Sequence, residues 1–139
     1  MYQTAFKAYD SVNKSTMSGR DIEAEILTKA ALRLKECQDN WAASERSVNL
    51  DAALKFNQRV WTIFQAELGK MDNPLPKGLK IDLLSLSAFI DKRTFEVMAH
   101  PAPEKLAILI NINHNIAAGL RTRPAVAESG IATTRLQPV

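Results

Sequence analysis

Large apolar residues recur at helical spacing along most of this chain. Between residues 50 and 68 they follow a single face: Leu50, Leu54, Trp61, Phe64 and Leu68. Such spacing is typical of an amphipathic helix. The chain has only five Gly and six Pro among 139 residues, and it has few clusters of β-branched residues from which a sheet could form. The pattern therefore predicts an all-α fold, a compact bundle of four main helices with a short additional helix at the N-terminus.

The short N-terminal helix is expected from an aromatic stripe. Tyr2, Ala5, Phe6 and Tyr9 follow the spacing of one helical face. A polar connector follows, and Ser18 is placed to cap the first main helix, which we expect to continue to about residue 40. Its inner face is expected at Ile22, Ile26, Leu27, Ala30 and Leu34.

Capping residues and prolines separate the next two main helices. Residues 41–48 are expected to form a loop, after which Asn49 caps a helix over 50–68 and Gly69 ends it. Residues 72–76, with the sequence DNPLP, interrupt the helical pattern, because the residue before a proline is disfavoured in helical conformation. The third main helix is expected from about residue 76 to residue 98. Its inward residues are expected to be Leu79, Leu83, Leu86 and Ile90.

The last main helix is expected to begin at Pro103, a residue well suited to the first helical position. Isoleucines alternate with other residues over 108–113, which would also fit a short strand. The flanking sequences EKLA and IAAGL are helix formers, and the chain supplies no partner strand. Residues after Arg123 lack aromatic residues and periodicity. We therefore predict a helical domain over residues 1–120 and a flexible tail over 121–139.

The charge distribution does not favour a nucleic-acid-binding surface. The net charge is +3, and residues 121–139 contribute +2 of it, with three arginines against Glu128. The domain itself is nearly neutral, and its acidic and basic residues interleave, whereas a phosphate-binding face clusters its cations. The lone Cys37 excludes an internal disulfide and suits a reducing compartment. With no membrane-length apolar run and no signal segment, the expectation is a soluble cytoplasmic protein that does not bind a membrane.

Catalytic and metal-binding patterns are missing from the sequence. The two histidines, His100 and His114, belong to no metal-ligand spacing. The chain also has no glycine-rich phosphate loop, nucleophile elbow or paired-carboxylate motif. We therefore expect neither an enzyme nor a protein that uses a metal, a cofactor or a small-molecule substrate.

Polar residues interrupt three of the apolar segments. They are carboxamides in FNQRVW (56–61), a charge triplet in LLSLSAFIDKR (83–93) and carboxamides in NINHNIAAGL (111–120). Because buried polar groups need partners, these segments are expected to meet one another or a partner protein. The candidate partner-binding residues are Asn57, Arg59, Trp61, Asp91, Lys92, Arg93, Asn111 and Asn113.

Each candidate also has a structural alternative. Trp61 is expected in the core rather than on a binding surface, because it shares a stripe with Leu50 and Leu54. Asn57, on the same inner face, favours a buried hydrogen bond between helices. Asp91 either belongs to a charged recognition patch at the rim of a groove or forms an ion pair with Arg59, and Lys92 is expected in solvent.

These segments resemble one known family, the flagellar biosynthesis regulator FlaF of alphaproteobacteria. The resemblance is carried by FNQRVWTIF (56–64), LPKGLKIDLLSLSAFIDKRTFEVM (75–98) and LININHNIAAGL (109–120), in that order and spacing. It covers residues 2–120, and the pair Ala8 and Tyr9 agrees with it. His114 departs from the pattern, since an arginine is expected there, and residues 121–139 inherit nothing from the family.

The resemblance implies a small cytoplasmic helical protein that is needed for flagellin production or export. It implies a secretion chaperone that binds flagellin and works beside the regulator FlbT. Such a chaperone could shield helical ends of unpolymerised flagellin by packing a helix into a groove. The alternative is a post-transcriptional regulator that binds flagellin mRNA, directly or with FlbT. The near-neutral domain argues against direct RNA binding, whereas the basic tail favours it.

Overall fold

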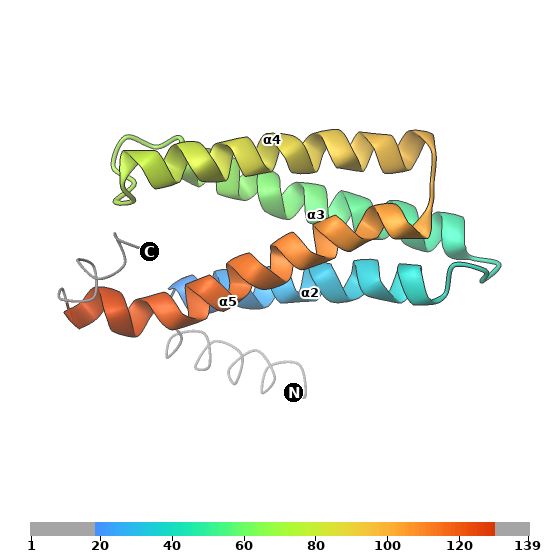
Figure 1. Ribbon diagram of the computed structural model, residues 1–139, viewed down its shortest axis with the longest axis horizontal. Helices are drawn as coiled ribbons and strands as arrows, with labels where there is room; N and C mark the ends of the chain where they lie inside the picture. Colours follow the sequence, from blue (N-terminus) through green and yellow to red (C-terminus); the bar gives the residue numbers. More distant parts are fainter. Residues whose placement is uncertain (1–18, 130–139) are drawn as a thin grey trace, which may run out of the picture. The chain divides into compact units, whose positions relative to one another are not determined.

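The computed structural model describes the backbone of residues 19–129 and the side chains of residues 19–121. The described chain forms α2 (Gly19–Asp39), α3 (Arg46–Leu68), α4 (Lys77–Ala99), the 3-10 helix η1 (Pro103–Leu106) and α5 (Ala107–Ser129) (Figure 1). Over this range no residue is in a strand. The predicted all-α fold with four main helices is confirmed. The predicted short helix near the N-terminus lies outside the described residues.

The chain divides into two compact units. The larger unit comprises Lys29–Asn113, and the described part of the smaller one comprises residues 19–28 and 114–129. In the smaller unit the Arg121 guanidinium donates a hydrogen bond of 2.9 Å to the Thr28 hydroxyl. The larger unit holds every sequence-predicted site residue, so the remaining description concentrates on it.

Helices α3 and α4 form an antiparallel pair, joined by residues 69–76 (Figure 1). Asn73 organises this connection. Its side-chain amide donates to the Glu67 carbonyl at 3.0 Å, and its side-chain oxygen accepts from the Leu75 N–H at 3.0 Å. Pro76 then precedes the first turn of α4, where its missing N–H costs no helical hydrogen bond. The interruption of the helical pattern that DNPLP predicts is therefore the turn that reverses the chain.

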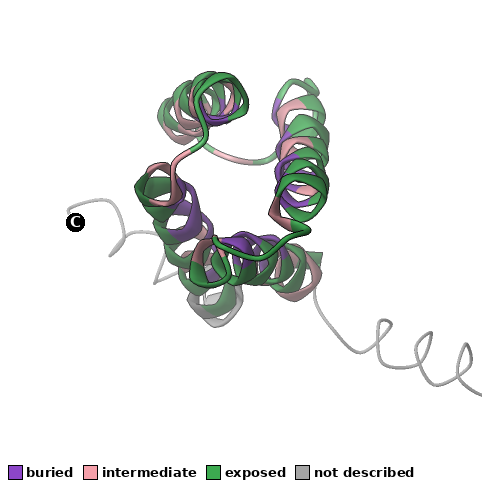
Figure 2. Ribbon diagram, turned by 90° about the vertical axis from the view of Figure 1, so that its right-hand side faces the viewer, coloured by how far each residue is buried: buried purple, intermediate pink, exposed green. Residues whose placement is uncertain are grey.

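The core of the larger unit is made of large apolar side chains from all its helices. Buried residues lie on the sides of helices that face one another, and exposed residues cover the outward sides (Figure 2). Trp61 is the largest fully buried side chain, with 1% of its surface exposed. Also fully buried in the larger unit are Leu34, Leu54, Ile90, Val97, Leu106 and Leu109. The expectation that Trp61 is a core residue is confirmed.

Two helix boundaries differ from those predicted. Helix α3 begins at Arg46, so Asn49 is already helical and donates its backbone N–H to the Glu45 carbonyl at 3.0 Å. The tight turn at residues 40–46, closed by two backbone bonds to Asn40 and Ala43, reverses the chain without needing the loop expected up to residue 48. Helix α5 continues to Ser129, past the predicted end at residue 120. The alanine-rich sequence after Pro124 has high helix propensity.

The buried face of α2 agrees in part with the predicted one. Ile26 was expected inside, but 38% of its surface is exposed. Leu27, Ala30 and Leu34 are fully buried, as predicted, and the small residues Ala24 and Ala31 are buried with them. Small side chains let neighbouring backbones approach closely, so the buried face is centred closer to Ala24 and Ala31 than side-chain size alone predicts. Among residues 19–129, no helix is long and apolar enough to cross a membrane.

Candidate functional site

A buried chain of hydrogen bonds joins α3 to the start of α5. The Trp61 indole N–H donates to Asn113 Oδ1 at 3.0 Å, and Asn113 Nδ2 donates to Asn57 Oδ1 at 2.6 Å. Asn57 and Asn113 are completely buried. Asn57 and Trp61 stand four residues apart, so both side chains leave the same face of α3. The interhelical hydrogen bond predicted for Asn57 is therefore present.

The buried carboxamide of α5 is Asn113, and its neighbour Asn111 is exposed. Helical spacing explains the choice, because Leu109, Asn113 and Ala117 are four residues apart and all are buried. One donor of this cluster, Asn57 Nδ2, makes no hydrogen bond to the described part of the chain. Asn57, Trp61 and Asn113 thus fix the packing of two helices, and their side chains lie beneath the surface that a partner would meet.

A second polar row lies between α3 and α4. Gln65 Nε2 donates to the hydroxyl of the buried Ser87 and, at 3.3 Å, to Asp91 Oδ2. Asp91 is half-buried, so its carboxylate belongs to this row at the edge of the helix pair. The alternative pairing of Asp91 with Arg59 is not found. Arg59 is exposed and forms no ion pair within the described part of the chain.

The three residues of the charge triplet have different environments. Arg93 makes two polar contacts. Its Nε lies 2.9 Å from Glu96 Oε1, and its Nη1 donates to the Lys105 carbonyl at 3.3 Å. Its guanidinium also lies over the Phe89 ring, 5.6 Å from the centroid. Lys92 is exposed, as predicted. Lys92 is therefore the only exposed residue of the triplet.

A hollow of about 610 Å³ lies beside the C-terminal end of α4. Phe95 and Ala99 form its apolar part, and Phe95 is 59% exposed. The polar lining comes from Lys92, Arg93, Glu96, His100 and Lys105. The Lys105 ammonium donates to the His100 carbonyl at 2.7 Å. The sequence analysis singled out Lys92 but missed Phe95, whose exposure follows from the rotation of α4.

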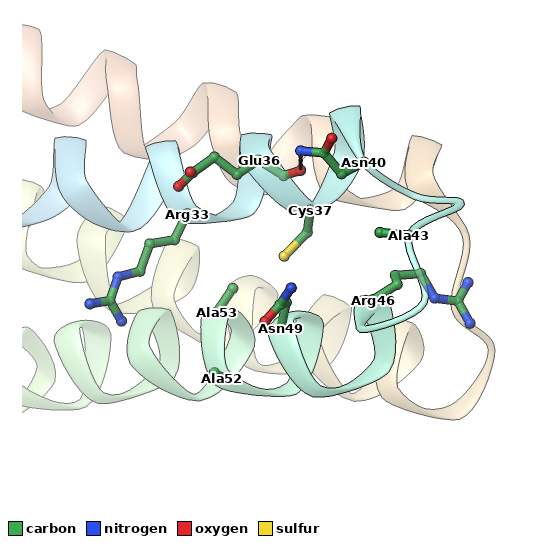
Figure 3. A pocket seen from close by; sticks show the side chains of 9 residues that line it. All are labelled: Arg33, Glu36, Cys37, Asn40, Ala43, Arg46, Asn49, Ala52 and Ala53. Atoms are coloured by element: carbon green, nitrogen blue, oxygen red, sulfur yellow. Dashed lines mark hydrogen bonds between the residues drawn. The ribbon is translucent and has the colours of Figure 1, made fainter.

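A second pocket, of about 440 Å³, lies between the end of α2 and the start of α3 (Figure 3). The Cys37 sulfur and the Asn49 side chain point into it from opposite helices, above the small residues Ala52 and Ala53 (Figure 3). Desolvation by burial, and then the nearby Glu36 carboxylate, raise the pKa of the Cys37 thiol. A thiol that keeps its proton at neutral pH is a poor nucleophile. The Cys37 thiol is therefore not activated as a nucleophile.

Cations around this pocket stack on aromatic rings. The Arg33 guanidinium lies 4.4 Å from the centroid of Phe56, and that of Arg46 lies 4.6 Å from the centroid of Trp41. Each contact joins neighbouring secondary-structure elements and anchors a cation that could otherwise meet a phosphate. In the region for which side chains are described, no group of three His, Cys, Asp or Glu residues could hold a metal ion.

The family relationship follows from the sequence match over these helices. The model for the flagellar protein FlaF matches residues 5–120. The chain belongs to the FlaF family. The match contains all three segments on which the resemblance was based, together with both polar rows and the hollow at the end of α4. It ends at residue 120, within α5, so residues 121–139 lie outside the FlaF region. Comparison with curated proteins and with solved structures gave no match.

Proposed function

We propose that this FlaF family protein is a cytoplasmic secretion chaperone that binds unpolymerised flagellin and supports flagellin production and export. The observation that carries the proposal is the exposure of large apolar side chains on helices of a FlaF family chain. Contiguous exposed apolar surface on a soluble protein commonly marks an interaction site. Among these residues are Ile63, Ile81 and Phe95, with 56%, 52% and 59% of their surfaces exposed.

A rigid scaffold supports this role. The bonds from Trp61 and Asn57 to Asn113 fix the start of α5 against α3, and the Gln65 bonds join α3 to α4. A surface that is ordered before binding loses less conformational entropy when the partner arrives. Helices held in this way suit the capture of an amphipathic helix from another protein.

The alternative function, direct regulation of flagellin mRNA, has weaker support. Several lysines of the described helices have acidic partners one turn away: Lys35 with Asp39, Lys55 with Asp51, and Lys70 with Glu67. Interleaved charges of this kind do not build the continuous cationic face that holds a phosphate backbone. A role in RNA regulation through FlbT would need a protein contact and is compatible with the chaperone proposal.

Co-purification from cells tests the proposal. The affinity-tagged chain is isolated from its flagellated host, with and without ribonuclease treatment, and the bound proteins are identified by mass spectrometry. We expect flagellin in both preparations, with FlbT as a possible additional component. Loss of flagellin after ribonuclease treatment would favour the RNA-regulator alternative, and absence of flagellin from both preparations would contradict the chaperone proposal.

A further inference from the structure

Helix α4 carries apolar residues on two opposite faces. One face points into the larger unit and includes the fully buried Ile90 and Val97. Successive residues of an α-helix are rotated by about 100° about its axis. This rotation places a second row of residues on the side of α4 opposite to Ile90 and Val97. This row, the outer stripe, consists of Ile81, Leu84, Ala88, Phe95 and Ala99, all of which are exposed.

The outer stripe is long enough to hold a partner helix. From Ile81 to Ala99 the helix advances by eighteen residue steps, or about 27 Å along the axis at about 1.5 Å per residue. Three of its members, Ile81, Leu84 and Phe95, are exposed by 52%, 39% and 59%. A helix that is apolar on all sides is usually buried on all sides. An exposed apolar stripe opposite the core is therefore the feature expected of a binding interface.

Positive charge accompanies the outer stripe. Lys92 interrupts it near its midpoint, and Lys77 and Lys80 lie at its N-terminal end. None of these lysines forms an ion pair with a residue of the described chain. The acidic groups of α4 that flank the stripe are engaged elsewhere: Glu96 pairs with Arg93, and Asp91 accepts a hydrogen bond from Gln65. The remaining one, Asp82, lies about a third of a turn from the stripe.

We propose that the outer stripe of α4 is the flagellin-binding surface and that it receives an acidic amphipathic helix. This inference rests on the chaperone function proposed above. Apolar side chains of the incoming helix pack along Leu84, Ala88 and Phe95, and the hollow of about 610 Å³ beside Phe95 accepts one large side chain. Carboxylates of the partner meet Lys92 and Lys105 at the rim of that hollow.

The lysines favour an acidic partner over a second copy of this chain. An antiparallel pair of α4 helices, centred on the stripe, would bring Lys92 close to Lys92 of the other copy. Like charges placed together at an interface oppose association, whereas an acidic helix neutralises them. The positive charge of the outer stripe therefore favours an acidic helix over a second copy of this chain and strengthens the binding of that helix.

Four single variants of the full chain test the surface. Phe95→Ser removes the largest apolar contact and Lys92→Glu reverses the central charge, and both residues are exposed. Leu32→Ser on α2 and Lys55→Glu on α3 are matched controls, because Leu32 is 53% exposed and Lys55 is likewise exposed. Thermal melts followed by circular dichroism establish that each variant folds.

Binding is measured by titrating fluorescently labelled monomeric flagellin with each variant at low and at high salt. We expect Phe95→Ser to weaken binding about tenfold or more. Lys92→Glu is expected to weaken binding several-fold at low salt and less at high salt, because ions screen exposed charges. The two controls should bind as the unaltered chain does.

The possible failures of the two proposals differ. If the unaltered chain does not bind flagellin, the chaperone proposal fails, and this inference fails with it. Should flagellin bind while both stripe variants retain full affinity, only the location on α4 is contradicted. A concentration-dependent dimer of the unaltered chain that Phe95→Ser abolishes would identify a second copy as the occupant and would overturn the acidic-helix inference.

Discussion

The indole N–H of Trp61 donates a 3.0 Å hydrogen bond to Asn113 Oδ1, joining two residues that are 52 positions apart in the chain. Asn113 in turn donates to Asn57, one helical turn before Trp61. A polar group on α5 is thus held by two residues of one α3 face. Because these groups are buried, a shift of either helix along its axis would leave donors and acceptors unpaired. The cluster therefore fixes the register between α3 and α5.

Substitution of Trp61 should separate the hydrogen bond from the packing of the ring. Trp61→Phe leaves Asn113 Oδ1 without this donor and should lower the free energy of unfolding by about 1–3 kcal/mol. Trp61→Ala also creates a cavity and should lower it by about 3–5 kcal/mol. Urea unfolding followed by circular dichroism measures both changes. Unchanged stability in Trp61→Ala, together with lost flagellin binding, would contradict the core role of this residue.

A double-mutant cycle tests the coupling between Asn57 and Asn113. Asn57→Ala removes the acceptor of the Asn113 amide, and the unfolding free energy should fall by about 1–3 kcal/mol. The pair Asn57→Leu and Asn113→Leu should cost less than the sum of the two single changes, because the second change removes the group that the first left unpaired. Urea unfolding of the unaltered chain, Asn57→Leu, Asn113→Leu and the double variant gives the coupling energy. Strictly additive changes would show that the two carboxamides do not act together.

The helices could be predicted because each has a periodic apolar face bounded by a glycine, a proline or a polar turn. Their rotations were harder to predict. On α2 the predicted inner residues Leu27, Ala30 and Leu34 are buried, but Ile26 is exposed. The alanines at 24 and 31 are buried in addition, because close approach outweighs side-chain size. Helix α4 has two apolar faces, and its sequence alone does not determine which of them meets α3.

Parts of the candidate site depended on details that the sequence pattern leaves open. The polar interior was predicted, and Asn57 was correctly assigned to an interhelical bond. Asn111 and Asn113 stand two residues apart, so only the rotation of α5 decides which one is buried. The exposure of Phe95 depends in the same way on the rotation of α4. The proposal that flagellin is the partner rests on the FlaF relationship, since neither charge nor periodicity identifies a partner.

Cys37 should make stability depend on alkaline pH. Burial raises the pKa of its thiol above the ordinary value of 9.0, so the folded state keeps this proton to a higher pH than the unfolded state. The stabilising contribution is complete below the unfolded pKa and is lost as the pH rises through the folded pKa. From about pH 8 to about pH 10, the unfolding free energy should therefore fall more steeply in the unaltered chain than in Cys37→Ala. Equal slopes would contradict the assigned shift.

Removal of residues 121–139 should leave the larger unit folded, because that unit ends at Asn113. The truncation eliminates the exposed hydrogen bond from Arg121 to Thr28, which should cost about 1 kcal/mol or less of unfolding free energy. Flagellin affinity should be retained. Any RNA affinity should decrease, because the deleted segment carries +2 of the net charge, and it should weaken with salt. Salt-insensitive RNA binding by the truncated chain would contradict the expectation that any RNA affinity depends on the basic residues of 121–139.

The most direct test of the chaperone function is size-exclusion chromatography with light scattering on the purified chain mixed with monomeric flagellin. Both proteins are used at tens of micromolar, so that an affinity of about 1 μM, or about 8 kcal/mol of binding free energy, gives a stable peak. We predict a new peak whose mass equals the sum of the two components in a fixed ratio, before and after ribonuclease treatment. Two unshifted peaks under these conditions would contradict the proposal that this FlaF family protein binds flagellin.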